Sequence, residues 1–85
     1  GNIGILGVDK KGEEFYQVSL GGSSKNKASL GKILGPAFSQ EEVPIVINKI
    51  IDVYLERRIG KEEFIDTFRR LGIEPFKKNA YAKGD

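Results

Sequence analysis

The chain contains no cysteine and no histidine among its 85 residues. Without cysteine there can be no disulfide framework, no thiolate metal site and no thiol nucleophile. Without histidine, the commonest general base and the commonest metal ligand of proteins are both missing. The sequence therefore predicts neither a catalytic residue nor a metal ligand in this chain.

Long apolar runs and a strong charge of one sign are also lacking. No apolar run approaches the ~18 residues that a membrane-spanning helix needs, and no signal-peptide pattern opens the chain. The 14 basic and 12 acidic residues leave a net charge of +2, too even a balance to indicate nucleic acid or a membrane surface as a partner. We expect a cytoplasmic protein with one small domain over residues 1–76.

Two strand-like runs open the sequence, over residues 2–8 and 13–20. Apolar and polar side chains alternate in the second run, as in a strand with one buried face. The connection, Asp-Lys-Lys-Gly, suits a type I turn closed by a left-handed glycine. Asp9 can accept hydrogen bonds from backbone amides of that turn, and Gly12 can take a positive φ. The sequence therefore predicts an antiparallel β-hairpin.

Gly4 and Gly7 interrupt the first of these strands. We interpret them as the mark of a bulged edge strand, with close approach of another backbone or of a flat ligand as the alternative. Beyond the hairpin, residues 21–38 form a long irregular segment. Within it, residues 28–34 favour a short helical turn that Gly35-Pro36 ends, with an apolar side made of Leu30, Ile33 and Leu34.

The longest helix is expected from residues 40–43 to about residue 59. Ser39 and Glu42 match a capping box. Pro44 favours a later start near residue 41 or 42, because its missing N–H costs nothing in a first turn. The apolar stripe at helical spacing consists of Val46, Ile47, Ile50, Ile51 and Tyr54.

Another helix is expected over residues 61–71, with a core face of Phe64, Phe68 and Leu71. Gly72 ends it, and Pro75 forbids its continuation. Residues 77–85 are polar, and we expect them to form a disordered tail.

Charged and glycine-rich clusters give no convergent site. Glutamates stand in pairs at 13–14, 41–42 and 62–63, but neighbours point to opposite faces of a strand or far apart around a helix. We interpret them as solvated surface and helix N-terminal charge. Residues 21–27 could cradle an anion, yet they lack the spacing of a P-loop, and a flexible surface loop is the simpler interpretation.

Three segments in this order resemble one known family. They are IGILGV over residues 3–8, EEFYQVSLGGS over residues 13–23 and FIDTFRRLGI over residues 64–73. Together they resemble the C-terminal end of the sulfite and nitrite reductase haemoproteins, the siroheme and iron–sulfur enzymes, over nearly the whole chain. In that family a Cys-x-x-x-Cys-Gly segment, whose thiolates bind the cluster, lies a few residues before the first of these strands. The resemblance therefore implies a fragment that begins just after the cysteines that bind the redox cluster.

A scaffold role follows from the resemblance. The parent would pass six electrons to sulfite or nitrite at a siroheme bridged to a 4Fe-4S cluster, whereas this chain would hold neither cofactor and would not be an enzyme alone. Its hairpin would continue the sheet that carries the last cysteine pair. Gly21 and Gly22 would lie near the siroheme or cluster, because bare glycines let a backbone approach a bulky group. The implied partners are the remainder of the parent chain and its electron-donor protein.

A free-standing binding module is the alternative, in which the hairpin edge or the basic helices meet a protein or RNA. Both interpretations share one fold class. We expect an α+β fold: an antiparallel β-hairpin, with room for a short third strand, packed against two main helices and a short helical turn.

Overall fold

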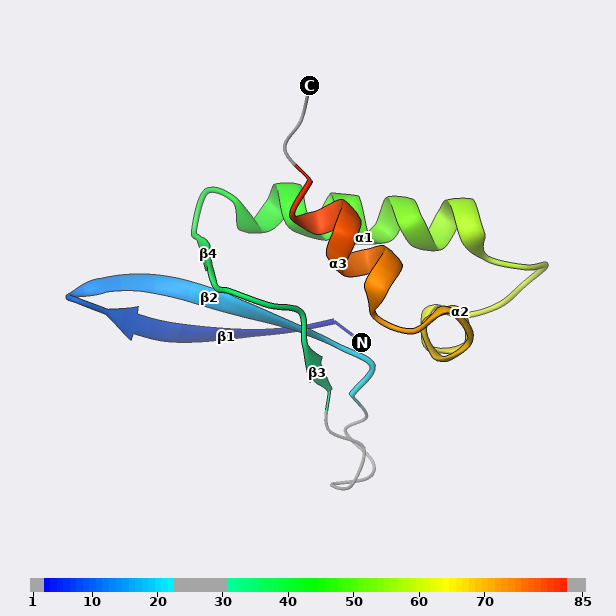
Figure 1. Cartoon of the computed structure of the whole chain (residues 1–85), viewed down its shortest axis with the longest axis horizontal. Helices are drawn as coiled ribbons and strands as arrows, with labels where there is room; N and C mark the ends of the chain where they lie inside the picture. Colours follow the sequence, from blue (N-terminus) through cyan, green and yellow to red (C-terminus); the bar gives the residue numbers. More distant parts are fainter. Residues whose placement is uncertain (1–2, 23–30, 83–85) are drawn as a thin grey trace.

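The computed structural model describes residues 3–22 and 31–82, which form an α+β fold, as predicted (Figure 1). Within these ranges a long hairpin and two short strands make one sheet, and helices follow it along the chain. The elements are β1 (Ile3–Lys10), β2 (Glu13–Leu20), β3 (Lys32–Ile33), β4 (Phe38–Ser39), α1 (Val43–Arg57), α2 (Phe64–Leu71) and α3 (Glu74–Ala80).

β2 is the central strand of the sheet. β1 pairs with it antiparallel from Ile3 opposite Leu20 to the turn, and β3 and β4 share its other side. The register of β1 is uninterrupted, so the predicted bulge is wrong. A close neighbour instead explains the glycine at position 4, since a Cβ added there would lie 2.7 Å from the Ser19 Oγ.

The hairpin turn is tighter than predicted. β1 continues to Lys10, so Lys11 and Gly12 alone form the loop, with φ of 52° and 85°. Two residues with positive φ define a type I′ turn, whose twist matches that of the strands, and the predicted type I turn is therefore wrong. The left-handed Gly12 is confirmed, and its N–H donates to the Asp9 Oδ1 at 3.1 Å, as expected.

The described part of the predicted helical turn pairs with β2 instead. Lys32 and Ile33 form β3, and the Leu34 N–H donates to the Val18 carbonyl at 2.7 Å. On the side of β2 away from β1, the backbone N–H and C=O groups of these residues find hydrogen-bond partners. A single helical turn would leave most of these groups without partners. Strand alternation then separates the predicted apolar side: Leu34 is buried, whereas Ile33 is 56% exposed. Leu30 lies outside the described residues.

α1 begins at Val43, close to the later of the two predicted starts, with Pro44 in its first turn. The predicted pairing of Ser39 with Glu42 exists just before the helix. The Glu42 carboxylate accepts the Ser39 backbone N–H at 2.9 Å and the Ser39 hydroxyl at 3.1 Å. These bonds hold the pKa of Glu42 below its ordinary value.

α2 begins at Phe64, later than the predicted residue 61. A capping box sets this start: the Glu63 side chain accepts a backbone N–H of the first turn, and the Asp66 carboxylate accepts the Glu63 N–H at 3.2 Å. Gly72, with φ of 80°, ends the helix as predicted.

The prediction of a disordered tail is wrong for residues 77–80, which belong to α3. Pro75 prevents extension of α2, but it lies in the first turn of α3, where proline is favoured. The Asn79 side-chain amide donates to the Lys49 carbonyl at 2.9 Å, and the Lys49 Nζ donates to the Ala82 carbonyl at 2.9 Å. α3 is thereby fastened along α1.

The core lies between β2 and the helices, and aromatic rings fill much of it. The ring centroids of Phe64 and Phe76 are 5.5 Å apart, and those of Phe68 and Phe76 are 5.8 Å apart. Phe68 is buried, as predicted, but Phe76, which was assigned no role, is buried completely. The other buried hydrophobic residues are Val18, Leu20, Leu34, Phe38, Val46, Ile50 and Ala80.

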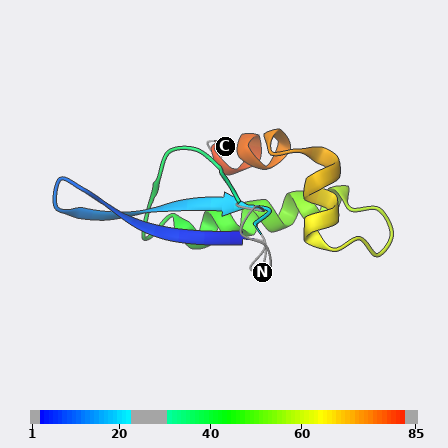
Figure 2. The same ribbon diagram turned by 90° about the horizontal axis from the view of Figure 1, so that it is seen from below.

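Figure 2 shows α3 along one margin of the molecule, whereas β1 and the N-terminal part of α1 lie toward the opposite margin. Among residues 3–22 and 31–82, no helix has the length and hydrophobicity that crossing a bilayer requires.

Candidate functional site

The glycine pair that was predicted to lie near a cofactor stands where β2 ends. Gly21 has a φ of 84°, and its α-carbon faces the ring of Phe68 on α2. A Cβ added to Gly21 would lie 2.5 Å from the Phe68 Cε2. Gly22 is half-buried, and its nitrogen would lie 3.3 Å from a Cβ added to Gly31. Packing against Phe68 is thus a sufficient reason for glycine at position 21, and proximity to a siroheme or cluster stays a prediction.

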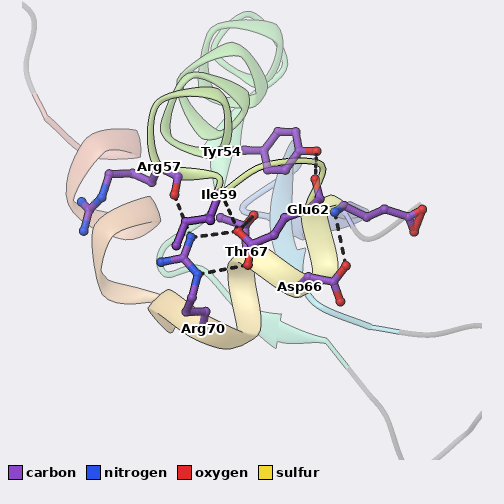
Figure 3. Close-up of polar contacts among 8 residues, drawn as sticks. Tyr54, Arg57, Ile59, Glu62, Asp66, Thr67 and Arg70 are labelled. Atoms are coloured by element: carbon purple, nitrogen blue, oxygen red, sulfur yellow. Dashed lines mark hydrogen bonds and ion pairs between the residues drawn. The ribbon is translucent and has the colours of Figure 1, made fainter.

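Glu62 gathers several polar contacts in the loop between α1 and α2 (Figure 3). Its Oε1 accepts the Ile59 N–H, the Thr67 hydroxyl and the Arg70 Nη2, each at 2.9 Å. Its Oε2 accepts the Arg70 Nε at 3.1 Å, so the guanidinium binds the carboxylate through two nitrogens. Thr67 and Arg70 lie on successive turns of α2. Residues three apart share one face of a helix, so both side chains can reach the same carboxylate.

These donors lower the pKa of Glu62 to about 2, with the hydrogen bond from Arg70 as the largest cause and the Ile59 N–H as the next. The carboxylate in turn raises the pKa of Arg70. A carboxylate with a pKa of about 2 is a weak base, and donors already occupy both of its oxygens, so it is a poor general base. Glu62 therefore serves the fold.

Two further hydrogen bonds tie the loop and α2 to α1. The Tyr54 hydroxyl donates to the Glu62 carbonyl at 2.5 Å, and the Arg70 Nη2 donates to the Arg57 carbonyl at 2.7 Å (Figure 3). We call Tyr54, Glu62, Thr67 and Arg70 the loop clamp. Sequence reasoning missed the clamp, because the helix predicted over residues 61–71 included Glu62, whereas the structure leaves Glu62 in the loop before α2.

Other members of the predicted glutamate pairs contact separate partners. Glu42 binds Ser39, Glu63 caps α2, and Glu14 accepts the Tyr16 hydroxyl at 2.7 Å. In the part of the chain that the structure describes, no three side chains of His, Cys, Asp or Glu lie close enough together to hold a metal ion.

A groove of about 550 Å³ runs between α1 and α3. Charges of both signs line it, so it offers no clear preference for an anion or a cation. Its polar lining consists of Asp52, Glu56, Arg57, Glu74, Lys78 and Asn79.

The described residues thus define a small α+β domain in which the polar clusters serve the fold. The chain belongs to the family described as the nitrite and sulphite reductase 4Fe-4S domain, whose model matches residues 2–83. This match confirms the resemblance seen in the three sequence segments. No curated protein and no solved structure matches the chain.

Proposed function

We propose that this chain is a scaffold portion of a siroheme- and 4Fe-4S-dependent sulfite or nitrite reductase, and that it has no catalytic activity alone. One observation carries the proposal: the family model covers residues 2–83, yet the sequence contains no cysteine. A 4Fe-4S cluster is held by cysteine thiolates. The chain therefore does not fit the cluster, and the ligands must come from another part of the reductase polypeptide.

The scaffold role is supported by the way the domain holds its own loops. The loop clamp fixes the connection between α1 and α2, and Phe68 on α2 packs against Gly21 at the end of β2. The end of β2 is thereby set relative to the helices. In the proposed assembly this fixed end, with Gly21 and Gly22, faces the cofactor-bearing part of the reductase in the cytoplasm.

The test is the reading frame that contains this chain. The proposal expects an in-frame Cys-x-x-x-Cys segment upstream of residue 3. The longer polypeptide should take up iron and sulfide anaerobically and show the broad visible absorption of a cluster. The 85-residue chain, treated identically, should stay colourless after desalting.

Two results would contradict the proposal. One is cluster absorption that stays with the 85-residue chain itself. The other is a start codon immediately before the chain with no cysteine segment upstream, which would favour a free-standing binding module. The exposed strand β1 is the feature that such a module would offer to a protein partner.

A further inference from the structure

Arg58 directly follows α1, and its guanidinium has no hydrogen-bond acceptor and no ion-pair partner in the part of the chain that the structure describes. Its Nε atom is buried, whereas the two Nη atoms remain open to solvent. Buried polar atoms nearly always have a hydrogen-bond partner, and a missing partner is most costly in a charged group. The fold of residues 3–22 and 31–82 therefore leaves the guanidinium of Arg58 incompletely satisfied.

The aromatic ring of Tyr54 supports this guanidinium. The Arg58 Cζ lies 5.0 Å from the centroid of the ring, a cation–π contact. The ring is itself held in place, because the Tyr54 hydroxyl donates to the Glu62 carbonyl (Figure 3) and the centroid of the Phe64 ring is 5.6 Å away. The guanidinium is thus oriented before any ligand arrives, which lowers the ordering cost of binding one.

The carboxylates of the neighbouring loop already have other partners. Donors from the loop and from α2 occupy both oxygens of Glu62, including two nitrogens of Arg70. Glu63 and Asp66 form the capping box of α2. The loop clamp therefore satisfies Arg70 and fixes the ring beneath Arg58, but it leaves no carboxylate of this loop for Arg58 itself.

The open side of Arg58 suits a carboxylate. A guanidinium is planar, and two of its N–H groups can bind the two oxygens of a carboxylate at once. The buried Nε shows that water is already excluded from one side of this cation. An anion at the open Nη atoms therefore gains more than it would at the exposed Arg57 or Arg69, where water screens the charge.

We propose that Arg58 is a carboxylate-binding site that receives an aspartate or glutamate side chain from another segment of the same reductase polypeptide. The inference rests on the proposed function, which requires a further polypeptide to supply the cluster thiolates. Leu55 lies three residues before Arg58, on the same side of α1, and is 57% exposed. The segment that brings the carboxylate therefore also covers apolar surface beside it.

Chemical modification tests whether the Nη atoms of Arg58 become occupied. An arginine-selective dicarbonyl reagent, which attacks these atoms, is applied to the 85-residue chain and to the longer polypeptide, and mass spectrometry of peptides measures each arginine. Arg58 should react at least about 10-fold more slowly in the longer polypeptide, because a bound carboxylate covers its N–H groups. Arg70, which Glu62 binds within the 85-residue chain, is the control and should react slowly in both samples.

Arg58→Lys, with Arg57→Lys as the matched control, identifies the carboxylate. Each variant keeps the positive charge and introduces an amine that a carbodiimide can join to a carboxylate in direct contact with it. In the longer polypeptide, Arg58→Lys should give a cross-link to an aspartate or glutamate outside the 85 residues. Arg57→Lys, at the exposed neighbouring position, should give no cross-link to that residue. This measurement separates ion pairing from simple burial of Arg58.

Several results would overturn the site, and they differ from one another. If the longer polypeptide binds a cluster while Arg58 still reacts rapidly, or is protected without a cross-link from Arg58→Lys, the site is wrong and the proposed function stands. If Arg58 is protected only after siroheme is loaded, the anion belongs to the cofactor and the side-chain ligand is wrong. If the longer polypeptide binds no cluster, the proposed function itself fails and the inference with it.

Discussion

The side of the molecule formed by α2 and α3 and the side formed by β1 differ in how far their groups are satisfied internally. On the helical side, Phe64, Phe68 and Phe76 pack on one another, and both oxygens of Glu62 carry donors from the loop and from α2. On the β1 side, Ile5 and Leu6 are about half exposed or more, and one row of backbone groups faces away from the sheet.

The difference shows on which side this small domain satisfies its polar and apolar groups internally, and on which side it leaves them exposed. An 85-residue chain has too little interior to bury every apolar side chain. Here Phe64, Phe68 and Phe76 pack together on one side, while the exposed aliphatic side chains include those of β1 and of one flank of α1. Substitutions on the two sides should therefore have very different effects on the isolated chain.

The largest effect is expected from Phe76→Ala, which removes a completely buried ring beside Phe64 and Phe68. The free energy of unfolding should fall by about 3–5 kcal/mol. Leu55→Ala, at a side chain that is 57% exposed, is the control and should stay within about 0.5 kcal/mol. Denaturant titration measures both, and equal losses would erase the contrast between the two sides.

Gly21→Ala and Gly12→Ala form a matched pair, because both glycines have positive φ near 85°. Gly12→Ala should cost about 1–2 kcal/mol from backbone strain alone, since no atom lies within 4 Å of the added Cβ. Gly21→Ala adds a collision with the Phe68 ring and should cost roughly 2–5 kcal/mol. Thermal melts measure the difference. Equal costs would leave approach to a cofactor as the better reason for Gly21.

Acid should weaken the loop clamp. The pKa of Glu62 is lowered from 4.5 to about 2 in the folded chain, so the ionised carboxylate stabilises the fold above the unfolded value. That contribution should disappear as the pH falls from 4.5 toward 2. Melting temperatures over this interval should fall less steeply for Glu62→Gln than for the native chain. Glu41→Gln, at an exposed glutamate, is the control and should keep the native slope.

The smallest effect is expected from Leu6→Lys in the isolated chain. Leu6 is 64% exposed, so its loss should change the free energy of unfolding by no more than about 0.5 kcal/mol. Denaturant titration checks the value. A loss above about 1 kcal/mol would show that this face of β1 is already packed within the chain, contrary to the open side described above.

The hairpin and the two longer helices were predictable because their signals are local. Alternation from Phe15 to Leu20 defines a strand, and Gly12 defines a left-handed position at the turn. Pro44 similarly indicated where α1 begins, because proline is favoured in the first turn of a helix. Each of these features depends on neighbours a few residues away, which a single sequence displays.

The features that were missed depend on residues distant in the sequence. β3 exists because β2 offers it hydrogen bonds, and the helical pattern of residues 28–34 could not reveal that partner. The polar composition of residues 77–85 predicts a disordered tail, although Ala80, like Phe76, is buried once the chain turns back along α1. The loop clamp requires Glu62 and Arg70 to meet across a loop and a helix.

The position of α3 has a consequence for synthesis of the protein. Phe76 and Ala80 belong to the same core as Val18 and Leu20, and Tyr81 stacks on Phe38 with ring centroids 4.8 Å apart. The hairpin leaves the ribosome before the helices, but its buried face has no complete cover until residues 76–81 have also emerged. Folding of this domain should therefore be completed only after translation has passed α3, and until then the apolar face of β2 must be kept from other chains.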